Sequence, residues 1–269
     1  MYRSVYDLKS FYNSPPGHMV RRVLGGRIQA LWPEVKGLRV MGCGYAVPYL
    51  MPFCGEAERV IAMMPTKQGV DWWGKDKGNL VFLSNETDLP IENASMDRIL
   101  LIHHLEACED LQGSLREMWR VLKPNGRLMV VVPNRAGFWS RSDWSPFGHG
   151  SPFSLTQLCF YLKDNLFVQE QTTSALYVPP LRWGAMMRSA AMFEYIGKSM
   201  IPMVGGVHIV EASKQIYAGV DKSGSGSGVL AKTREMLGGK PVAVPQGFSP
   251  SRCTKHSKFP EGYPDQRRP

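Results

Sequence analysis

The 269-residue chain lacks the features that mark secreted and membrane-spanning proteins. Its five cysteines are odd in number and form no Cys-x-x-Cys pair, which argues against a disulfide framework or a zinc cluster. No stretch reaches about 18 uninterrupted apolar residues, and the N-terminus has no apolar segment of the kind found in secretory signals. We therefore expect reduced thiols, no membrane span, no bound metal and a cytoplasmic location.

The net charge of +9 is unevenly spread along the chain. Residues 220–269 hold nine Lys and Arg against four Asp and Glu, which is over half of the excess. The same stretch contains a Ser-Gly repeat and little apolar periodicity, so residues 219–269 are predicted to form a flexible basic tail. The remaining body is only mildly basic, and we expect no nucleic-acid partner.

Short apolar runs alternate with helical or loop-like segments in the first half of the chain. Their near-continuous apolar character is typical of strands that are buried on both faces. The clearest helix is 110–122, where Leu111, Leu115, Met118 and Leu122 share one face. This alternation predicts an α/β fold with a parallel sheet. The runs span residues 38–41, 59–63, 79–83, 96–102 and 127–133.

The flanking segments complete the predicted organisation. Residues 1–36 read as a helical lead-in or lid, with Ser4 as a cap, a break at 13–17 and a helix at 18–32. A domain at 37–218 follows. Its second half contains an aromatic loop at 134–153, a helix capped by Ser154, two strands and a helical, Met-rich insert at 182–204. The helix is expected at 154–163 and the strands at 167–177 and 205–214.

The first apolar run ends in Gly42-Cys43-Gly44, and an apolar segment that is expected to be helical follows. Glycine lets the backbone turn sharply and lets a ligand lie against it. The start of the next helix would offer unpaired N–H groups to that ligand. The alternative is a tight turn with no ligand.

Three blocks in the middle of the chain carry a resemblance to a known family. They are 88–97 (Asp-Leu-Pro-Ile-Glu-Asn-Ala-Ser-Met-Asp), 101–106 (Leu-Ile-His-His-Leu-Glu) and 115–126 (Leu-Arg-Glu-Met-Trp-Arg-Val-Leu-Lys-Pro-Asn-Gly). In order and spacing they resemble class I S-adenosylmethionine (SAM)-dependent methyltransferases of the Methyltransferase-11 type. The resemblance covers residues 36–134 well. It implies a Rossmann-like fold with a seven-stranded, mainly parallel sheet, helices on both faces, and SAM as cofactor.

The resemblance also implies positions for the site. The sequence departs from the family at the end of the second strand, where Met63-Met64 stands in place of the carboxylate that binds the ribose of SAM. Asp71 can substitute for that carboxylate only if its loop folds back. Asn85 stands where the family often has Asp. No fixed catalytic residue follows from the sequence. Cofactor contacts are expected from Gly42, Cys43, Gly44, Tyr45, Met63, Met64, Asn85, Glu86, His103 and Tyr12, and substrate contacts from His104, Arg135, Trp139 and Trp144.

The function that these observations favour is methyl transfer from SAM to a small-molecule acceptor. The alternative is a catalytically degenerate methyltransferase-like protein that works as a binding or regulatory partner, motivated by the missing acid and by the insert. The insert at 182–204 can pack in the core, cover a substrate or contact a protein partner. The other candidates also have a structural alternative: core packing for Tyr12, a hydrogen-bonded pair at a helix start for the two histidines, and a local hydrophobic cluster for the aromatic loop.

Overall fold

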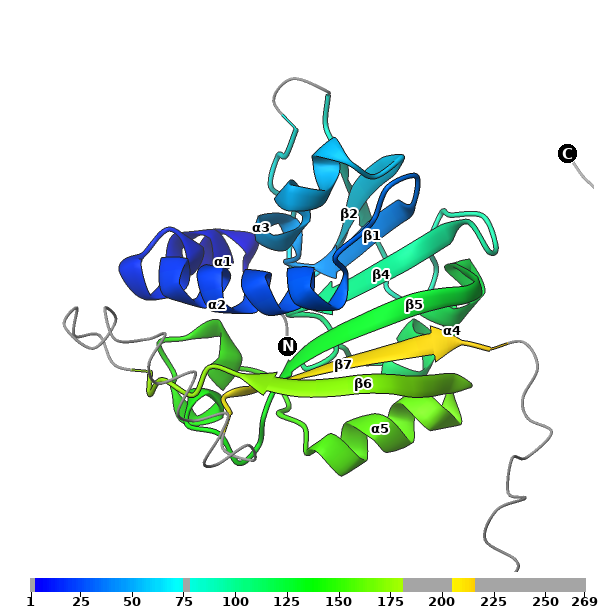
Figure 1. Cartoon of the computed structure of the whole chain (residues 1–269). Coiled ribbons are helices and arrows are strands. Elements are labelled where there is room, and N and C mark those ends of the chain that lie inside the picture. Colours follow the sequence, from blue (N-terminus) through cyan, green and yellow to red (C-terminus); the bar gives the residue numbers. More distant parts are fainter. Residues whose placement is uncertain (1–2, 75–77, 181–204, 216–269) are drawn as a thin grey trace, which may run out of the picture. The chain divides into compact units, whose positions relative to one another are not determined.

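A computed structural model describes residues 3–74, 78–180 and 205–215 (Figure 1). By its internal contacts the chain divides into two units, Met1–Ala218 and Gly219–Pro269, and all of the described residues belong to the first. The predicted insert at 182–204 and the predicted tail at 219–269 lie outside the described residues.

The sheet has seven strands in the order β3-β2-β1-β4-β5-β7-β6. Strands β1 to β5 run parallel to one another, whereas β7 is antiparallel to both β5 and β6. This confirms the predicted seven-stranded, mainly parallel sheet. The strands are β1 (Arg39–Gly44), β2 (Arg59–Pro65), β3 (Val81–Ser84), β4 (Met96–Ile102), β5 (Leu122–Pro133), β6 (Phe167–Ala175) and β7 (Val207–Lys214).

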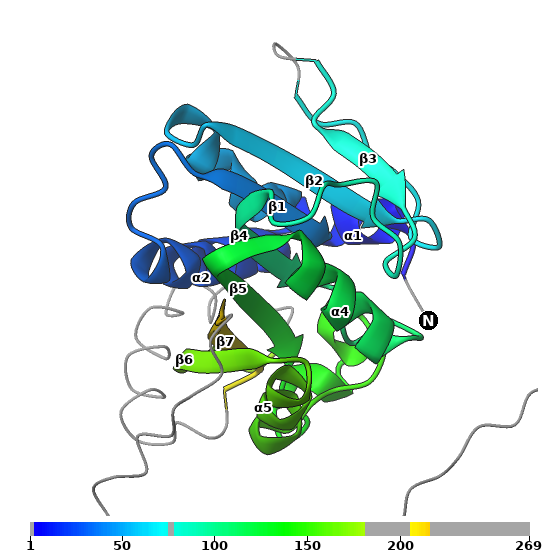
Figure 2. The ribbon, with the colours of Figure 1, turned by 90° about the vertical axis from the view of Figure 1, so that its right-hand side faces the viewer.

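Helices cover both faces of this sheet, as Figures 1 and 2 show. Neighbouring residues of β4 illustrate the two cores: Leu100 packs with α1, α2 and α3, while Leu101 packs with α4 and α5. A strand that is buried on both faces needs an unbroken apolar run, which is what the sequence provides at β4. The helices are α1 (Val5–Tyr12), α2 (Pro15–Leu31), α3 (Val47–Leu50), α4 (Leu111–Val121) and α5 (Leu155–Asp164).

Side-chain caps fix the start of four helices. Ser4, Ser14, Asp110 and Ser154 each accept a hydrogen bond from a backbone N–H in the first turn of the helix that follows. Such a cap satisfies a donor that has no partner within the helix. The caps predicted at Ser4 and Ser154 are confirmed.

Helix α2 starts inside the break predicted at 13–17. Pro15 and Pro16 occupy its first turn, where a missing N–H costs nothing because that donor has no helical partner. Gly17 then allows α2 to pass close to α1, since a Cβ atom there would overlap the carbonyl oxygen of Phe11. The turn formers therefore shape a tight corner between two helices.

Two further boundaries differ from the prediction. Strand β5 begins at Leu122, which pairs with Met96, and not at the start of the predicted run at 127–133; residues 123–126 bulge out before Arg127 pairs with Arg98. The helix after the glycine turn spans only Val47–Leu50 and continues as a 3₁₀-helix, η1 (Met51–Gly55). Pro52 ends the α-helix because it has no N–H to donate to the preceding turn.

The aromatic loop at 134–153 contains two short 3₁₀-helices, η2 (Trp139–Arg141) and η3 (Pro146–Gly148). Within the described ranges, no helix is both long enough and apolar enough to cross a lipid bilayer.

Candidate functional site

The site is built around the turn that leaves β1. Gly44 has a positive φ of 79°, and a Cβ atom at this position would overlap the carbonyl oxygen of Ile102 at the end of β4. The backbone N–H of Tyr45 donates to that same oxygen at 2.9 Å. The glycine is therefore required for the close approach of the turn to β4, at the edge where ligands of such sheets bind.

The residues beside Gly44 point in different directions. The Cys43 side chain is buried in the core with α4, where its Sγ lies 3.8 Å from Sδ of Met118, and burial raises its pKa. Gly42 faces α3, since a Cβ atom there would press on Ala46 and Leu50. A ligand at this turn therefore meets the backbone and Tyr45, and not the cysteine thiol.

A hydrogen-bonded chain crosses the carboxyl end of β4. The hydroxyl of Tyr49 donates to that of Tyr12 at 3.1 Å, and the Tyr12 hydroxyl lies 2.8 Å from Nε2 of His103. The other ring nitrogen, Nδ1 of His103, lies 3.3 Å from Oε1 of Glu106. If Tyr12 donates to Nε2, the proton on Nδ1 points to the carboxylate, which is the usual way to orient an imidazole.

All four of these side chains are buried. The second carboxylate oxygen of Glu106, Oε2, is buried and has no hydrogen-bond partner in the described structure. A buried carboxylate oxygen of this kind is costly unless a donor meets it. His103 also has a φ of 52°, an uncommon conformation for a residue with a side chain, and such conformations cluster at functional sites.

Aromatic rings pack around these hydrogen-bonded side chains. Tyr12 stacks on Tyr45 with a centroid distance of 5.5 Å, and the ring of Phe147 lies 4.7 Å from that of His103. Burial raises the pKa of Tyr12 well above its ordinary value. Burial, together with the nearby Asp71 carboxylate, raises the pKa of Tyr45 to about 12. Both phenols are therefore neutral hydrogen-bonding groups near pH 7.

Strand β2 ends without an acidic residue, but the loop that follows brings the carboxylate of Asp71 back toward it. Met63 and Met64 are fully buried. The loop that follows folds back, so that the backbone N–H of Asp71 lies 3.4 Å from Sδ of Met64. The Asp71 carboxylate is paired with Lys9 at 2.9 Å and is near enough to Tyr45 to affect its pKa. The loop therefore folds back onto the end of β2, as a ribose contact from Asp71 would require.

Asn85 and Glu86 follow β3. The amide oxygen of Asn85 accepts from the backbone N–H and the hydroxyl of Thr87, which fixes the amide. Glu86 is buried and accepts from the Cys108 thiol at 3.2 Å. Burial and this carboxylate raise the pKa of Cys108 to about 12.

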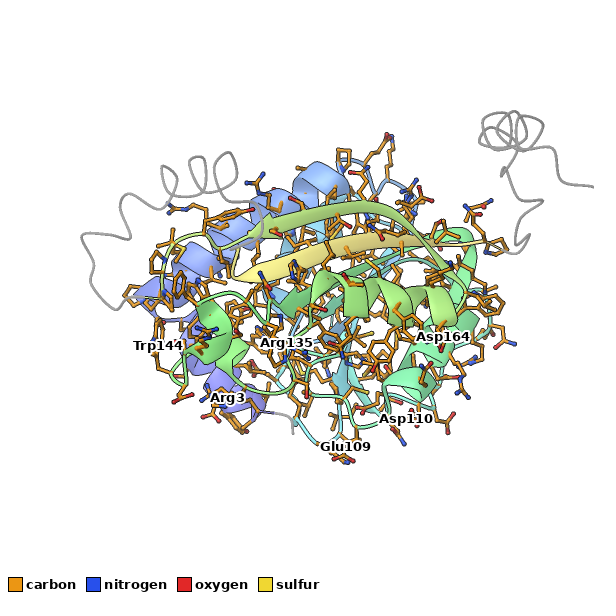
Figure 3. All side chains as sticks on the ribbon, turned by 90° about the horizontal axis from the view of Figure 1, so that it is seen from below. Arg3, Glu109, Asp110, Arg135, Trp144 and Asp164 are labelled. Carbon is orange, nitrogen blue, oxygen red and sulfur yellow. The ribbon has the colours of Figure 1, made fainter. Side chains whose placement is uncertain are left out.

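The residues predicted to contact a substrate do not gather at one place. His104 turns into the core, where its Nε2 lies 2.9 Å from the hydroxyl of Ser114, and burial lowers its pKa to about 4. Trp139 is buried and donates to the carbonyl oxygen of Val178. Trp144 packs on Trp139 at 6.1 Å. Figure 3 shows Arg135 apart from Trp144, on the face that α5 covers.

Three residues of the site are absent from the predicted contacts, Tyr49, Glu106 and Phe147. Tyr45 and Tyr49 are four residues apart in an apolar segment, and that spacing is the signal that could have placed both on one side of the turn. Phe147 had no comparable signal, since its contact with His103 depends on the path of the aromatic loop.

Comparison with known proteins identifies the central part of the chain. Residues 40–130 match the sequence model of a family described as a methyltransferase domain. This segment is a methyltransferase domain. It contains the β1 turn, Asp71, Asn85 and His103, whereas Tyr12 and the aromatic loop lie outside the matched range. The match confirms the family that the three sequence blocks indicated.

Curated relatives of the methyltransferase domain match over a limited length. One is the Mycobacterium tuberculosis protein named "Probable S-adenosylmethionine-dependent methyltransferase Rv3030", which is 33% identical over 104 residues. That alignment covers 38% of this chain and 38% of the relative. The chain spans 36–38% of the length of the curated relatives it matches.

Solved structures match the fold over most of the chain. A SAM-dependent methyltransferase from Archaeoglobus fulgidus aligns with a TM-score of 0.53 at 18% identity, covering 78% of this chain and 100% of that one. A SAM-dependent methyltransferase from Mesorhizobium loti aligns with a TM-score of 0.51 at 14% identity, covering 76% and 99%. At these identities the likeness concerns the fold, which is that of the class I methyltransferases.

Proposed function

We propose that this protein binds SAM at the carboxyl edge of β1, β2 and β4 and transfers its methyl group to a small-molecule acceptor. The observation that carries the proposal is the return of Asp71 to the end of β2. It puts a carboxylate beside Tyr45, next to the glycine turn. The domain match supports the class of reaction, and the geometry supports the place.

The residues at this edge fit the parts of SAM. The turn at Gly42–Gly44 would hold the amino-acid part, and the Asp71 carboxylate would accept hydrogen bonds from the two ribose hydroxyls. The Asn85 amide nitrogen would face the adenine ring, since the amide oxygen already accepts from Thr87. The buried Oε2 atom of Glu106 has no partner in the described structure and offers an acceptor to a bound cation.

When bound, SAM supplies a sulfonium with an activated methyl group that passes directly to a nucleophilic atom of the acceptor. The chain's own task is to hold that atom in line with the methyl group, since orientation supplies much of the rate. An acceptor that loses a proton also needs a base. For this role we propose a relay in which the Tyr12 hydroxyl takes the proton from the acceptor while it passes its own proton to Nε2 of His103, which Glu106 orients.

The rival function, a degenerate protein that only binds a partner, was motivated by the missing acid at Met63-Met64 and by the insert at 182–204. The ribose contact proposed for Asp71 would supply the acid whose absence is the first motive. The insert lies outside the described residues, so no structural observation favours a partner there.

Isothermal titration with SAM and with S-adenosylhomocysteine tests the proposal. The expected dissociation constant is in the micromolar range, about −8 kcal/mol. Asp71→Asn should weaken binding about tenfold or more, because an amide gives the two hydroxyls a weaker acceptor than a carboxylate. Asp164→Asn, an isosteric change on the exposed end of α5, is the matched control and should leave affinity unchanged.

The outcome against the proposal is equally clear. No binding of either compound at millimolar concentration would overturn the assignment of SAM. Binding that is unaffected by Asp71→Asn would leave SAM in place but would remove Asp71 from the ribose contact.

A further inference from the structure

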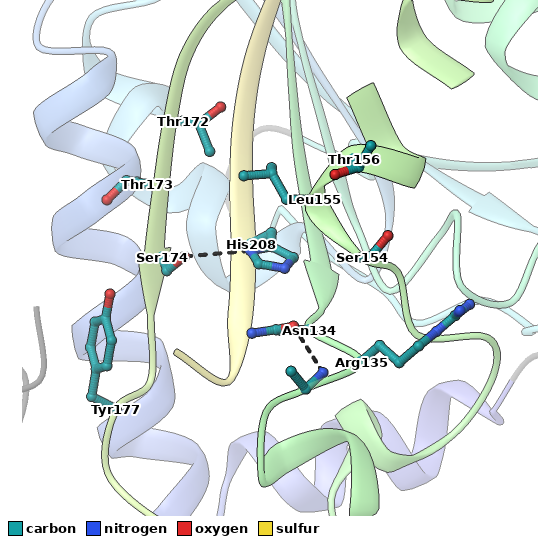
Figure 4. A pocket seen from close by; sticks show the side chains of 11 residues that line it. Asn134, Arg135, Ser154, Leu155, Thr156, Thr172, Thr173, Ser174, Tyr177 and His208 are labelled. Atoms are coloured by element: carbon teal, nitrogen blue, oxygen red, sulfur yellow. Dashed lines mark hydrogen bonds between the residues drawn. The ribbon is translucent and has the colours of Figure 1, made fainter. Parts of the chain in front are cut away.

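A pocket of about 620 Å³ lies away from the β1 turn, against β6, β7 and the first turn of α5. Figure 4 shows its side chains around the ring of His208. Its wall is largely hydroxyl-bearing, with apolar surface from Leu155 and Ala136. The lining residues are Asn134, Arg135, Ala136, Ser154, Leu155, Thr156, Thr172, Thr173, Ser174, Tyr177 and His208.

His208 forms the floor of this pocket. It is buried on β7, and its Nδ1 lies 3.4 Å from the hydroxyl of Ser174 (Figure 4). Burial lowers the pKa of His208, so the ring is neutral near pH 7. A neutral imidazole bonded through one nitrogen can meet a polar ligand atom with the other.

Arg135 supplies a cation to the described wall of the pocket. The Arg135 guanidinium donates to the carbonyl oxygen of Pro152 at 3.2 and 3.3 Å and to the amide oxygen of Gln157 at 3.0 Å. Both acceptors are neutral, so these bonds orient the guanidinium without neutralising it. Among the described residues that line the pocket, none is Asp or Glu.

We infer that this pocket binds a small molecule with an apolar body and one anionic group. The anionic group lies at Arg135, and the body lies over His208 and the threonine and serine hydroxyls. Its volume is in the range of small-ligand pockets, and such sites combine apolar surface with a few placed polar groups. The planar guanidinium suits carboxylate and phosphate alike.

This ligand site is separate from the proposed methyl-transfer site. The pocket is built on the antiparallel end of the sheet and on α5, whereas Gly44, Asp71 and His103 lie on β1, on the loop after β2 and at the end of β4. Ligand binding here does not depend on SAM, so it can be measured without it.

A pair of fluorescent probes tests the inference with the full chain. 1-Anilinonaphthalene-8-sulfonate carries an anionic group on an apolar body, and N-phenyl-1-naphthylamine is the same body without the charge. The sulfonate should bind at one site about tenfold or more tightly than the neutral probe, since hydrogen bonds between charged partners are stronger than those between neutral ones. The difference in affinity between the two probes gives the contribution of the charged group separately from that of the apolar body.

Variants locate the binding. Arg135→Gln should bring the sulfonate down to the affinity of the neutral probe and leave the neutral probe unchanged. Arg135→Lys should retain most of the preference, and Arg141→Gln, on the same loop but outside this pocket, should retain all of it. Ala136→Phe should weaken both probes by filling the pocket. Circular dichroism of each variant checks that the fold is intact.

The inference is overturned if neither probe binds at 100 µM (about −5.5 kcal/mol), if both bind equally, or if Arg135→Gln leaves the sulfonate affinity unchanged. Competition then distinguishes the two sources of the anionic group. Displacement by phenylacetate supports a carboxylate ligand, and displacement by phenyl phosphate supports a phosphate ester.

Discussion

The hydroxyl of Tyr12 lies 2.8 Å from Nε2 of His103, although the two residues are 91 positions apart in the sequence. The bond ties the lead-in helix α1 to the end of β4 and buries both side chains. It therefore makes α1 part of the proposed site and not merely a neighbour of it. The same imidazole is held on its other side by Glu106.

Tyr12→Phe should destabilise the protein by about 1–3 kcal/mol, because it leaves a buried imidazole nitrogen without its donor. Urea unfolding followed by circular dichroism measures the change. Tyr6→Phe is the matched control on the same helix: its side chain is 73% exposed, and the change should stay within about 0.5 kcal/mol. Equal stability of the two variants would show that the bond contributes nothing.

Gly44→Ala and Gly26→Ala should change stability in opposite directions. At Gly44, a positive φ and the overlap with the Ile102 carbonyl oxygen should together cost about 2–5 kcal/mol. Gly26 lies in α2, and a Cβ atom there meets nothing within 4 Å. Alanine should stabilise that helix by roughly 0.5–1 kcal/mol.

Thermal unfolding of the two alanine variants shows whether each substitution raises or lowers the stability. If Gly26→Ala also lowers the stability, the open space around Gly26 does not determine the effect of the added Cβ atom. A neutral effect at Gly44 would mean that the turn can move away from β4, and the proposed ligand edge would then be adaptable.

The sequence predicts the fold well where a local signal and the final structure agree. The run at 96–102 became β4 without a shift, because a buried parallel strand requires what that run contains. Ser4 and Ser154 act as caps because an N-cap depends only on the next few residues. At 123–126 the turn formers do bend the chain: Leu122 pairs with Met96 and Arg127 with Arg98, so the residues between them bulge out, and Asn125 has a φ of 59°. Only the start of the strand differs, because the pairing of Leu122 with Met96 extends β5 ahead of the run at 127–133.

The site is less predictable because its residues come from distant segments. The glycine turn is visible in the sequence. The position of Asp71 near the end of β2, in contrast, depends on how the loop after β2 packs against α1. His103 and His104 are adjacent and chemically identical. Because of the positive φ of His103, its ring points toward Tyr12, whereas the ring of His104 points toward Ser114. The sequence alone does not distinguish the two orientations.

Trp32→Phe should destabilise the protein by about 2–4 kcal/mol. The indole N–H of Trp32 donates to Oε1 of Glu211 at 2.8 Å, and this carboxylate is buried on β7. Arg127 satisfies only the other oxygen, at 3.0 Å. The variant therefore leaves a buried charged oxygen without its donor and a smaller ring in the core.

The matched control for Trp32→Phe is Trp72→Phe, whose side chain is 65% exposed. It should change the free energy of unfolding by less than about 0.5 kcal/mol. Tryptophan fluorescence changes in both variants, so unfolding is better followed by circular dichroism. A small effect of Trp32→Phe would indicate that Arg127 compensates by bonding both oxygens of Glu211.

Stability should fall between pH 6.5 and pH 4 because of His104. Burial lowers its pKa from an ordinary 6.5 to about 4, so in this range the unfolded chain takes up a proton that the folded protein does not. The contribution is fully present above pH 6.5 and is lost as pH falls toward 4. At pH 5 the loss is roughly 2 kcal/mol relative to pH 8.

His104→Gln removes the titrating group and can keep a hydrogen bond to Ser114 through its amide. Urea unfolding at pH 8 gives the constant difference between the variant and the parent protein, and this serves as the internal control. Between pH 8 and pH 5 the variant should lose less stability than the parent by about that 2 kcal/mol. Parallel pH curves for the two proteins would contradict the assignment, because they would mean that His104 is reached by solvent and protonates as easily in the folded protein as in the unfolded chain.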